Sequence, residues 1–174
     1  MASTLLHYAI AATSDGCVLL AGSDKGIRAL FLGDDDETLE AALEEAFPGV
    51  ELRRDKEAVS KWMQPVLDYL ESGGDMPDLP LDPEGTPFQC RVWDLLRAIP
   101  SGETRTYGEL AETLGLPGGA RAVGAACAAN RIAVLIPCHR AVREDGGLGG
   151  YRWGISRKRH LLELERHAQQ MSLF

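Results

Sequence analysis

Residues 71–85 divide this chain into two parts of different composition and opposite charge. The segment reads ESGGDMPDLPLDPEG, and Gly and Pro at this density interrupt regular helices and strands. Residues 1–85 hold 6 Lys and Arg against 18 Asp and Glu, a net charge of −12, whereas residues 86–174 hold 12 against 8, a net charge of +4. We therefore predict one domain over 1–80 and another over 86–174, the basic one being the working half. Chance together with a solvated acidic face is the alternative explanation of the charge asymmetry.

Apolar runs and turn-forming clusters alternate in the first 33 residues. The clusters at 14–16 and 22–26 separate three apolar runs, which predicts a meander of antiparallel strands. An acidic amphipathic helix, a short strand and a second helix should follow, and Pro65 should kink or break that second helix. The predicted strands are 5–12, 16–21, 27–32 and 50–52, and the predicted helices are 35–47 and 55–70.

The second part of the chain is predicted to be mostly helical. Thr86 and Pro87 are residue types that favour an N-cap and a first helical position, and an apolar stripe continues from them to Ile99. Two short helices flank the glycine-containing turn 115–119, an arrangement typical of a helix-turn-helix. The predicted helices are 86–99, 107–114, 120–130 and 156–166, and an apolar run at 132–137 precedes a cysteine.

The four cysteines indicate neither a zinc module nor a disulfide framework. Cys17, Cys90, Cys127 and Cys138 form no C-x-x-C pair, and no histidine stands at zinc-finger spacing from them. The sequence has no run of about 18 apolar residues, and its first 16 residues lack the basic start of a signal peptide. We predict a cytoplasmic protein with reduced thiols that spans no membrane.

Residues 136–140, Ile-Pro-Cys-His-Arg, place a candidate nucleophile beside a base and a cation. A cysteine thiol is mostly protonated at neutral pH, so a nucleophilic cysteine needs a nearby base or positive charge. His139 is the candidate base and Arg140 the candidate charge for Cys138. Because adjacent side chains on an extended chain point to opposite faces, a water relay can replace direct contact. The alternative is an inert, buried cysteine that ends a core strand, which is the commoner fate of a free cysteine.

Three further features accompany this cysteine in the sequence. The helix expected over 120–130 is rich in small residues, which allow close approach either to a DNA groove or to the protein core. Arg121 in that helix has no acidic residue three or four positions away, which favours the DNA interpretation. Tyr107 is a candidate hydrogen-bond donor in a pocket or a packing residue, and the glycine-rich run 146–150 is a pocket wall or a surface turn.

Taken together, these residues resemble the O6-alkylguanine-DNA alkyltransferase family. The resemblance covers residues 86–165 and depends on PCHR at 137–140, on Arg121-Ala-Val and Asn130 before it, and on Tyr-Arg-Trp-Gly at 151–154 after it. It implies a suicide DNA-repair protein that moves an alkyl group from O6 of guanine, or O4 of thymine, onto Cys138 after base flipping. It also implies an N-terminal ribonuclease-H-like α/β domain with an antiparallel sheet, followed by a helical domain with a helix-turn-helix.

The resemblance implies a role for each site residue. Cys138 is the alkyl acceptor, His139 is the base acting through a water, and Glu165 orients His139. Tyr107 polarises the target base, and Asn130 braces the turn beside the nucleophile. Arg121 fills the space that the flipped nucleotide leaves in the stack. The residues implied to contact DNA are Arg121, Tyr107, Ala120, Ala122, Arg140 and Arg152, and those implied to line the substrate pocket are Ala141, Tyr151, Arg152 and Trp153.

The same resemblance sets the expected partner and cofactors. The partner is double-stranded DNA bearing O6-alkylguanine, bound by a monomer in the cytoplasm beside the nucleoid, or in the nucleus of a eukaryote. No cofactor is expected. His7 and Cys17 do not reproduce the zinc ligands of human-type members, so no metal is expected either. Trp153 is expected to narrow the pocket against bulky groups such as benzyl.

Three other functions stay open on the sequence alone. An alkyltransferase-like binding module would flip lesions and recruit repair factors, although in such proteins another residue replaces the acceptor cysteine. A cysteine hydrolase that uses Cys138, His139 and Asn130 would turn over ester substrates. A helix-turn-helix regulator would prefer one DNA sequence over others, whereas a repair protein would prefer a lesion.

Overall fold

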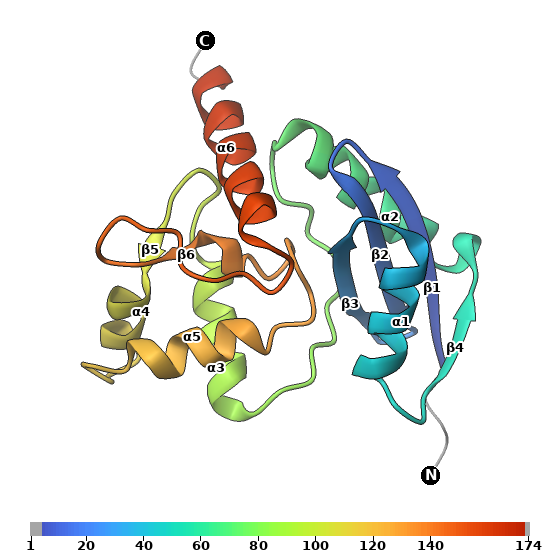
Figure 1. Ribbon diagram of the computed structural model, residues 1–174, viewed down its shortest axis with the longest axis horizontal. Helices are drawn as coiled ribbons and strands as arrows, with labels where there is room; N and C mark the ends of the chain where they lie inside the picture. The colour runs from blue at the N-terminus through green and yellow to red at the C-terminus, as the bar shows by residue number, and fades with distance from the viewer. Residues whose placement is uncertain (1–4, 173–174) are drawn as a thin grey trace.

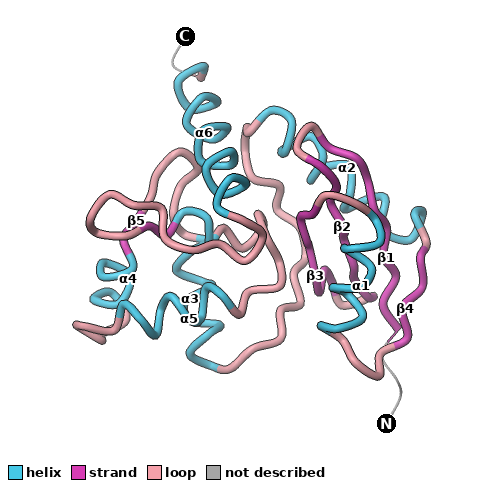
Figure 2. Tube along the Cα trace, in the orientation of Figure 1, coloured by secondary structure: helices cyan, strands magenta, loops and turns pink. Residues whose placement is uncertain are grey.

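The computed structural model describes residues 5–172 of the chain. Within them, a four-stranded sheet with two helices is followed by a part with four further α-helices. Figure 1 shows these two parts side by side, with α6 (Ile155–Met171) standing at the top between them. Figure 2, in the same orientation, shows that nearly all strand residues lie on one side of the molecule. None of the helices in the described part of the chain is long and apolar enough to cross a membrane.

The sheet is mixed, with strand order β3-β2-β1-β4. The three strands of the meander pair in antiparallel fashion as predicted, but β4 pairs with β1 in parallel. The prediction of an antiparallel sheet is therefore wrong for its fourth strand. The reason is that a helix connects β3 to β4, and a helical crossover returns the chain in the direction of the strand before it. The strands are β1 (Leu5–Thr13), β2 (Gly16–Ser23), β3 (Gly26–Gly33) and β4 (Glu51–Arg54).

Two helices cover the sheet, α1 (Asp36–Ala46) in front and α2 (Lys56–Ser72) behind in Figure 1. Each begins after an aspartate whose side chain accepts a hydrogen bond from a backbone N–H of the first turn. Residues 18–21 of the central strand β2 are buried one after another, as expected for a strand covered on both faces.

Helix α2 continues through Pro65, so the helix does not end there. A proline removes the hydrogen bond to the carbonyl four residues earlier, which belongs to Lys61. The apolar face of α2, which includes Val59, Met63 and Val66, is buried and holds the helix on the sheet.

Later segments of the chain pair with the open edge of β3. The backbone of Ile27 exchanges hydrogen bonds of 2.9 and 2.8 Å with residues 80–82, and that of Leu30 exchanges two of 2.9 Å with residues 131–133. The predicted linker 71–85 therefore runs along the sheet over part of its length. An unpaired strand edge invites aggregation, and these contacts cover it while joining the sheet to the second part of the chain.

The second part contains α3 (Pro87–Arg97), α4 (Tyr107–Thr113), α5 (Ala120–Ala128) and α6. The predicted N-cap of α3 is confirmed, since Thr86 and Gln89 form a capping box with bonds of 3.1 and 2.9 Å. The indole of Trp93 donates to the carbonyl of Ala126 at 2.9 Å, which joins α3 to α5. The elements too short for the sequence to predict are β5 (Arg105–Thr106), β6 (Ala141–Val142) and a 3₁₀ turn, η1 (Cys138–Arg140).

Candidate active site

The side chain of Asn130 organises the backbone turn that leads to Cys138. Its amide nitrogen donates to the carbonyls of Ile132 and Ile136 at 3.3 and 3.0 Å and lies 3.4 Å from Sγ of Cys138. Its amide oxygen accepts from the N–H of Ile132 at 2.9 Å. Within this turn Val134 has a φ of 70°, a strained conformation for a β-branched residue. The fully buried amide thus compensates for a backbone that the sequence alone would not favour.

Cys138, His139 and Arg140 form the single 3₁₀ turn η1, whereas the sequence argument assumed an extended chain. With three residues per turn, successive side chains leave the axis about 120° apart. The thiol of Cys138 accordingly faces a cavity, while His139 and Arg140 both reach Glu165 on α6. The two neighbours of the cysteine therefore act on one carboxylate.

Cys138 forms part of the wall of an open cavity of about 650 Å³. Although only 4% of the residue is exposed, the cavity gives its thiol access to a ligand. Volumes of this size are typical of small-molecule binding sites. Cys138 thus belongs to the buried core cluster and also lines the cavity, which favours the nucleophile over the inert alternative. The other lining residues are Tyr107, Gly124, Cys127, Ala128, Arg143, Gly147, Leu148, Gly149, Gly150, Tyr151 and Arg152.

Burial favours the protonated form of the Cys138 thiol. Burial raises the pKa of Cys138 to about 11, against the opposing effects of the Asn130 amide and the charges of Lys158 and Arg152. Arg140, the cation expected from the sequence, is paired with Glu165 instead. A nucleophilic role for Cys138 therefore requires a base that removes its proton.

We expect alkylation of Cys138 by iodoacetamide to accelerate with pH well beyond pH 9. Because only the thiolate reacts, the rate constant should rise about tenfold per pH unit up to a pH near the raised pKa of the thiol. The measurement is peptide mass spectrometry of timed samples, with the half-buried Cys90 in the same samples as a monitor of reagent quality. A rate constant for Cys138 that levels off below pH 9 would contradict the raised pKa.

Glu165 forms the centre of a buried charged cluster. Its Oε1 lies 3.0 Å from Nε2 of His139 and accepts from Nε of Arg140 at 3.0 Å, while its Oε2 accepts from Nη2 of Arg140 at 2.7 Å. Burial would raise the pKa of Glu165, but its interactions with His139 and Arg140 outweigh that effect and hold the pKa at about 2. Burial lowers the pKa of His139. The pair is therefore an ionised carboxylate beside a neutral imidazole, which can accept a proton.

Lys158 is a site residue that the sequence reasoning missed. Its fully buried ammonium donates to the carbonyls of Ala141 and Gly150 at 2.7 and 3.2 Å and to the phenol of Tyr107 at 3.3 Å. Burial lowers the pKa of Lys158 and raises that of Tyr107 to about 12. A signal existed, because Lys158 and Glu165 are seven residues apart and share the apolar face of α6, where charged residues are rare.

Three residues predicted to contact DNA or line the pocket lie elsewhere. Arg140 is 3% exposed with its guanidinium engaged inside the protein, so its side chain does not face the surface where DNA contact is predicted. Ala141 is fully buried, and its carbonyl accepts from Lys158. Trp153 packs edge-on against Tyr151, with ring centroids 5.3 Å apart, and is not part of the cavity wall. All three residues are therefore buried in the protein.

The exposed face of α5 lies beside the cavity. Arg121 and Ala122 are exposed and Ala120 is half-buried, while the opposite face of the helix is buried. Arg121 forms no ion pair within the described residues. Arg152 is exposed at the other side of the cavity and donates to the carbonyl of Asn130 at 3.3 Å. The small residues of α5 thus pack closely against the protein on one face. On the exposed face their short side chains protrude little from the helix.

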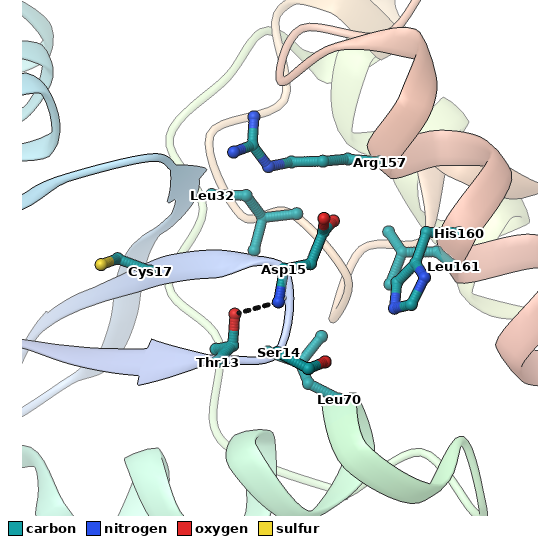
Figure 3. A pocket seen from close by; sticks show the side chains of 9 residues that line it. All are labelled: Thr13, Ser14, Asp15, Cys17, Leu32, Leu70, Arg157, His160 and Leu161. Carbon is teal, nitrogen blue, oxygen red and sulfur yellow. Dashed lines mark hydrogen bonds between the residues drawn. The ribbon is translucent and has the colours of Figure 1, made fainter.

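A second, much smaller cavity lies between the β1–β2 turn and α6 (Figure 3). Its lining includes Asp15 from the turn and Arg157 and His160 from α6, but its volume of about 20 Å³ suits a single water. No group of three or more His, Cys, Asp or Glu in residues 5–172 is arranged to hold a metal ion.

The chain matches known proteins over nearly its whole length. Residues 87–167 match the family model for the DNA-binding domain of 6-O-methylguanine DNA methyltransferase. The chain is 46% identical to the bifunctional transcriptional activator/DNA repair enzyme Ada of Escherichia coli, over 92% of this chain and 45% of Ada. It is 34% identical to the inducible methylated-DNA–protein-cysteine methyltransferase of Bacillus subtilis, over 94% of this chain and 92% of that protein.

Solved structures resemble this fold over nearly the whole chain. The structure of Mycobacterium tuberculosis OGT in complex with DNA superimposes with a TM-score of 0.79 at 39% identity, covering 93% of this chain and 94% of that one. The chain spans about half the length of several relatives that it matches, among them Ada and its counterpart in Salmonella typhimurium.

Proposed function

Because the chain belongs to the methylated-DNA–protein-cysteine methyltransferase family, we propose that it repairs DNA by direct reversal. It transfers an alkyl group from O6 of guanine, or O4 of thymine, to Sγ of Cys138, once per protein molecule. The observation that carries this function is that Cys138 lines an open cavity, while the imidazole of the next residue, His139, is paired with the carboxylate of Glu165. Its substrate is DNA, so it works where the chromosome lies, in the cytoplasm of a bacterium or the nucleus of a eukaryote.

Helices α4 and α5 act as a helix-turn-helix that presents α5 to the DNA. The two helices pack on each other across the turn at 114–119, and the exposed face of α5 is low enough to enter a groove. The net charge of +4 on residues 86–174 adds attraction to phosphates that does not depend on sequence. Residues 86–174 form the DNA-binding and active-site domain, and residues 1–80 form a ribonuclease-H-like α/β domain packed beside it.

The target nucleotide leaves the stack to reach the cavity, and Arg121 fills the space that it leaves. Extruding a nucleotide costs a few kcal/mol, and an inserted side chain offsets part of that cost. Arg121 suits this role because it is exposed near the start of α5, while Gly124 and Ala128 of the same helix line the cavity. Tyr107, Tyr151 and Arg152 then enclose the flipped base.

Arg121→Ala should weaken binding to a duplex that holds O6-methylguanine about tenfold, and binding to the unmodified duplex much less. The lesion complex is the one in which the nucleotide is flipped, so only that complex loses the inserted side chain. The measurement is fluorescence anisotropy with both duplexes at one salt concentration, using Cys138→Ser as background so that no transfer occurs. Arg97→Ala, which removes an exposed arginine of α3 in the same part of the chain, is the matched control. Equal losses on both duplexes would contradict the role of Arg121 in flipping.

The transfer begins when His139 removes the proton of Cys138 through a water. The thiolate then attacks the alkyl carbon, so that the S–C bond forms as the C–O6 bond breaks, and the guanine keeps the electron pair. Glu165 stabilises the imidazolium that results from proton removal, as the 3.0 Å separation of the two groups permits. The amide of Asn130, 3.4 Å from Sγ of Cys138, holds the sulfur in line with the C–O6 bond that breaks.

Tyr107 and Lys158 act on the departing base. The phenol of Tyr107 lines the cavity and donates a proton to the guanine as the C–O6 bond breaks. The ammonium of Lys158, 3.3 Å from the phenol oxygen, stabilises the phenolate that this donation leaves. The same charge favours the thiolate form of Cys138.

The proposed function is tested by following the DNA during a single turnover. A duplex with one O6-methylguanine is incubated with increasing amounts of protein, and the nucleosides are separated by chromatography after digestion. We expect guanine to be restored in proportion to the protein added, about one lesion per molecule, and not at all by Cys138→Ser. Many lesions repaired per molecule, or none with the wild-type protein, would overturn the proposal.

A further inference from the structure

We infer that Tyr69, which belongs to the sheet-bearing first part of the chain, positions the catalytic carboxylate Glu165. The inference deepens the proposed alkyl transfer and depends on it. It gives helix α2 a role in catalysis, although neither the sequence analysis nor the proposed transfer steps include a residue of α2. The reacting groups all lie in residues 86–174, but one hydrogen bond that fixes them comes from the other part of the chain.

The phenol of Tyr69 reaches across the interface between α2 and α6. Its hydroxyl donates to Oε2 of Glu165, accepts from Nη2 of Arg140 at 3.3 Å and lies 3.5 Å from the hydroxyl of Ser101. Only 2% of Tyr69 is exposed, so water does not compete for these contacts. Burial and the nearby carboxylate raise the pKa of Tyr69 above its usual value, and the phenol stays a hydrogen-bond donor.

Each oxygen of Glu165 has two neighbouring donor groups, which fixes the plane of the carboxylate. Oε1 faces Nε2 of His139 and Nε of Arg140, and Oε2 faces Nη2 of Arg140 and the phenol of Tyr69. Arg140 is itself anchored by a bond of 2.6 Å from its Nη1 to the carbonyl of Ile99. Because the phenol draws negative charge toward Oε2, it also lowers the basicity of the oxygen that faces His139.

The charged and titratable groups around this carboxylate come from η1, two helices and one loop. Arg140 and His139 come from η1, Tyr69 comes from α2, and Lys158 and Tyr151 act on the cluster at longer range from α6 and the loop before it. Of these groups, Tyr69 contacts the carboxylate without belonging to the cysteine turn or to α6. Removing its hydroxyl therefore changes Glu165 while the ring, the turn and the helix stay in place.

Tyr69→Phe should slow methyl transfer about tenfold at pH 7 and shift the acidic limb of the pH–rate profile to higher pH. Without the phenol, the carboxylate is less well stabilised as an anion, so the pKa values of both Glu165 and its partner His139 rise. Either rise in pKa shifts the acidic limb to higher pH, because the reaction needs an ionised Glu165 and a neutral His139. The matched control is Tyr8→Phe, which removes the same atom from a tyrosine–glutamate hydrogen bond far from the cavity.

A role in stability alone would lower the rate evenly at every pH, and that result would overturn the inference. An unchanged rate and profile would also overturn it, provided that the wild-type protein transfers methyl groups. Absence of transfer by the wild type would instead overturn the proposed function.

A readout that needs no activity is the NMR titration of the His139 imidazole, whose pKa should rise in Tyr69→Phe. If that variant does not fold, 3-fluorotyrosine at position 69, a stronger donor of the same shape, should shift the acidic limb to lower pH, and no shift would contradict the inference.

Discussion

Replacing Glu165 by glutamine is expected to lower the free energy of unfolding at pH 7 by about 3–5 kcal/mol, the usual cost of breaking a buried ion pair from one side. Arg140 would remain 3% exposed with its positive charge unpaired, and one of its two hydrogen bonds to Glu165, at 3.0 and 2.7 Å, would face an amide NH2 in place of an acceptor oxygen. The measurement is urea unfolding followed by circular dichroism. A loss below about 1 kcal/mol would contradict the buried ion pair.

The exposed pair between Arg54 and Asp36 provides the matched control. Its side chains are about half exposed and 3.0 Å apart, so Asp36→Asn should cost less than about 1 kcal/mol. The pH dependence of the free energy of unfolding gives a second check, because the direction of the change is fixed. The pKa of Glu165 is lowered from 4.5 to about 2 on folding, so its contribution is present above pH 4.5 and is lost as pH falls toward 2. The difference between wild type and Glu165→Gln should therefore shrink over that range.

Lys158→Met is expected to slow methyl transfer about 100-fold, a size typical of losing one oriented electrostatic contact in an active site. Methionine fills a similar volume but removes the bonds of 2.7, 3.2 and 3.3 Å to Ala141, Gly150 and Tyr107. The phenol of Tyr107 loses its partner, and Cys138 loses a nearby positive charge, which raises the pKa of the thiol further. The measurement is the single-turnover rate of methyl transfer between pH 6 and 10.

The control for this variant is Lys56→Met, which removes an exposed lysine from the first turn of α2. It should leave the rate unchanged. Because Lys158→Met also leaves two carbonyls without a donor, its stability must be measured in parallel, and transfer is compared at a temperature where both proteins are folded. A folded Lys158→Met protein that transfers methyl groups at the wild-type rate would contradict the role of Lys158.

Most elements of the fold follow from local sequence signals. Turn clusters bounded the three antiparallel strands, and the Thr86-Pro87 pair located the start of α3 correctly. The parallel placement of β4 could not be predicted, because it depends on the path that the chain takes after α1. That α2 would not end at Pro65 could not be predicted, because the buried apolar face that holds the helix on the sheet is a property of the folded protein.

The candidate site could be predicted only in part. The motif around Cys138 and the position of Asn130 and Glu165 pointed to residues that the fold brings together. The direction in which Arg140 points could not be predicted, since it follows from a 3₁₀ turn of three residues. Tyr69 lies 96 residues from Glu165 along the chain, and no local pattern connects the two.

Methyl transfer to Cys138 is tested most directly by peptide mass spectrometry of the protein after incubation with DNA that contains O6-methylguanine. We expect a gain of about 14 Da on the peptide with Cys138, at about one methyl group per molecule, and no gain on the peptide with Cys127. Cys127 is the informative comparison because its side chain lines the same cavity. Restored guanine with an unmodified Cys138, or a methyl group on Cys127 instead, would contradict the central claim.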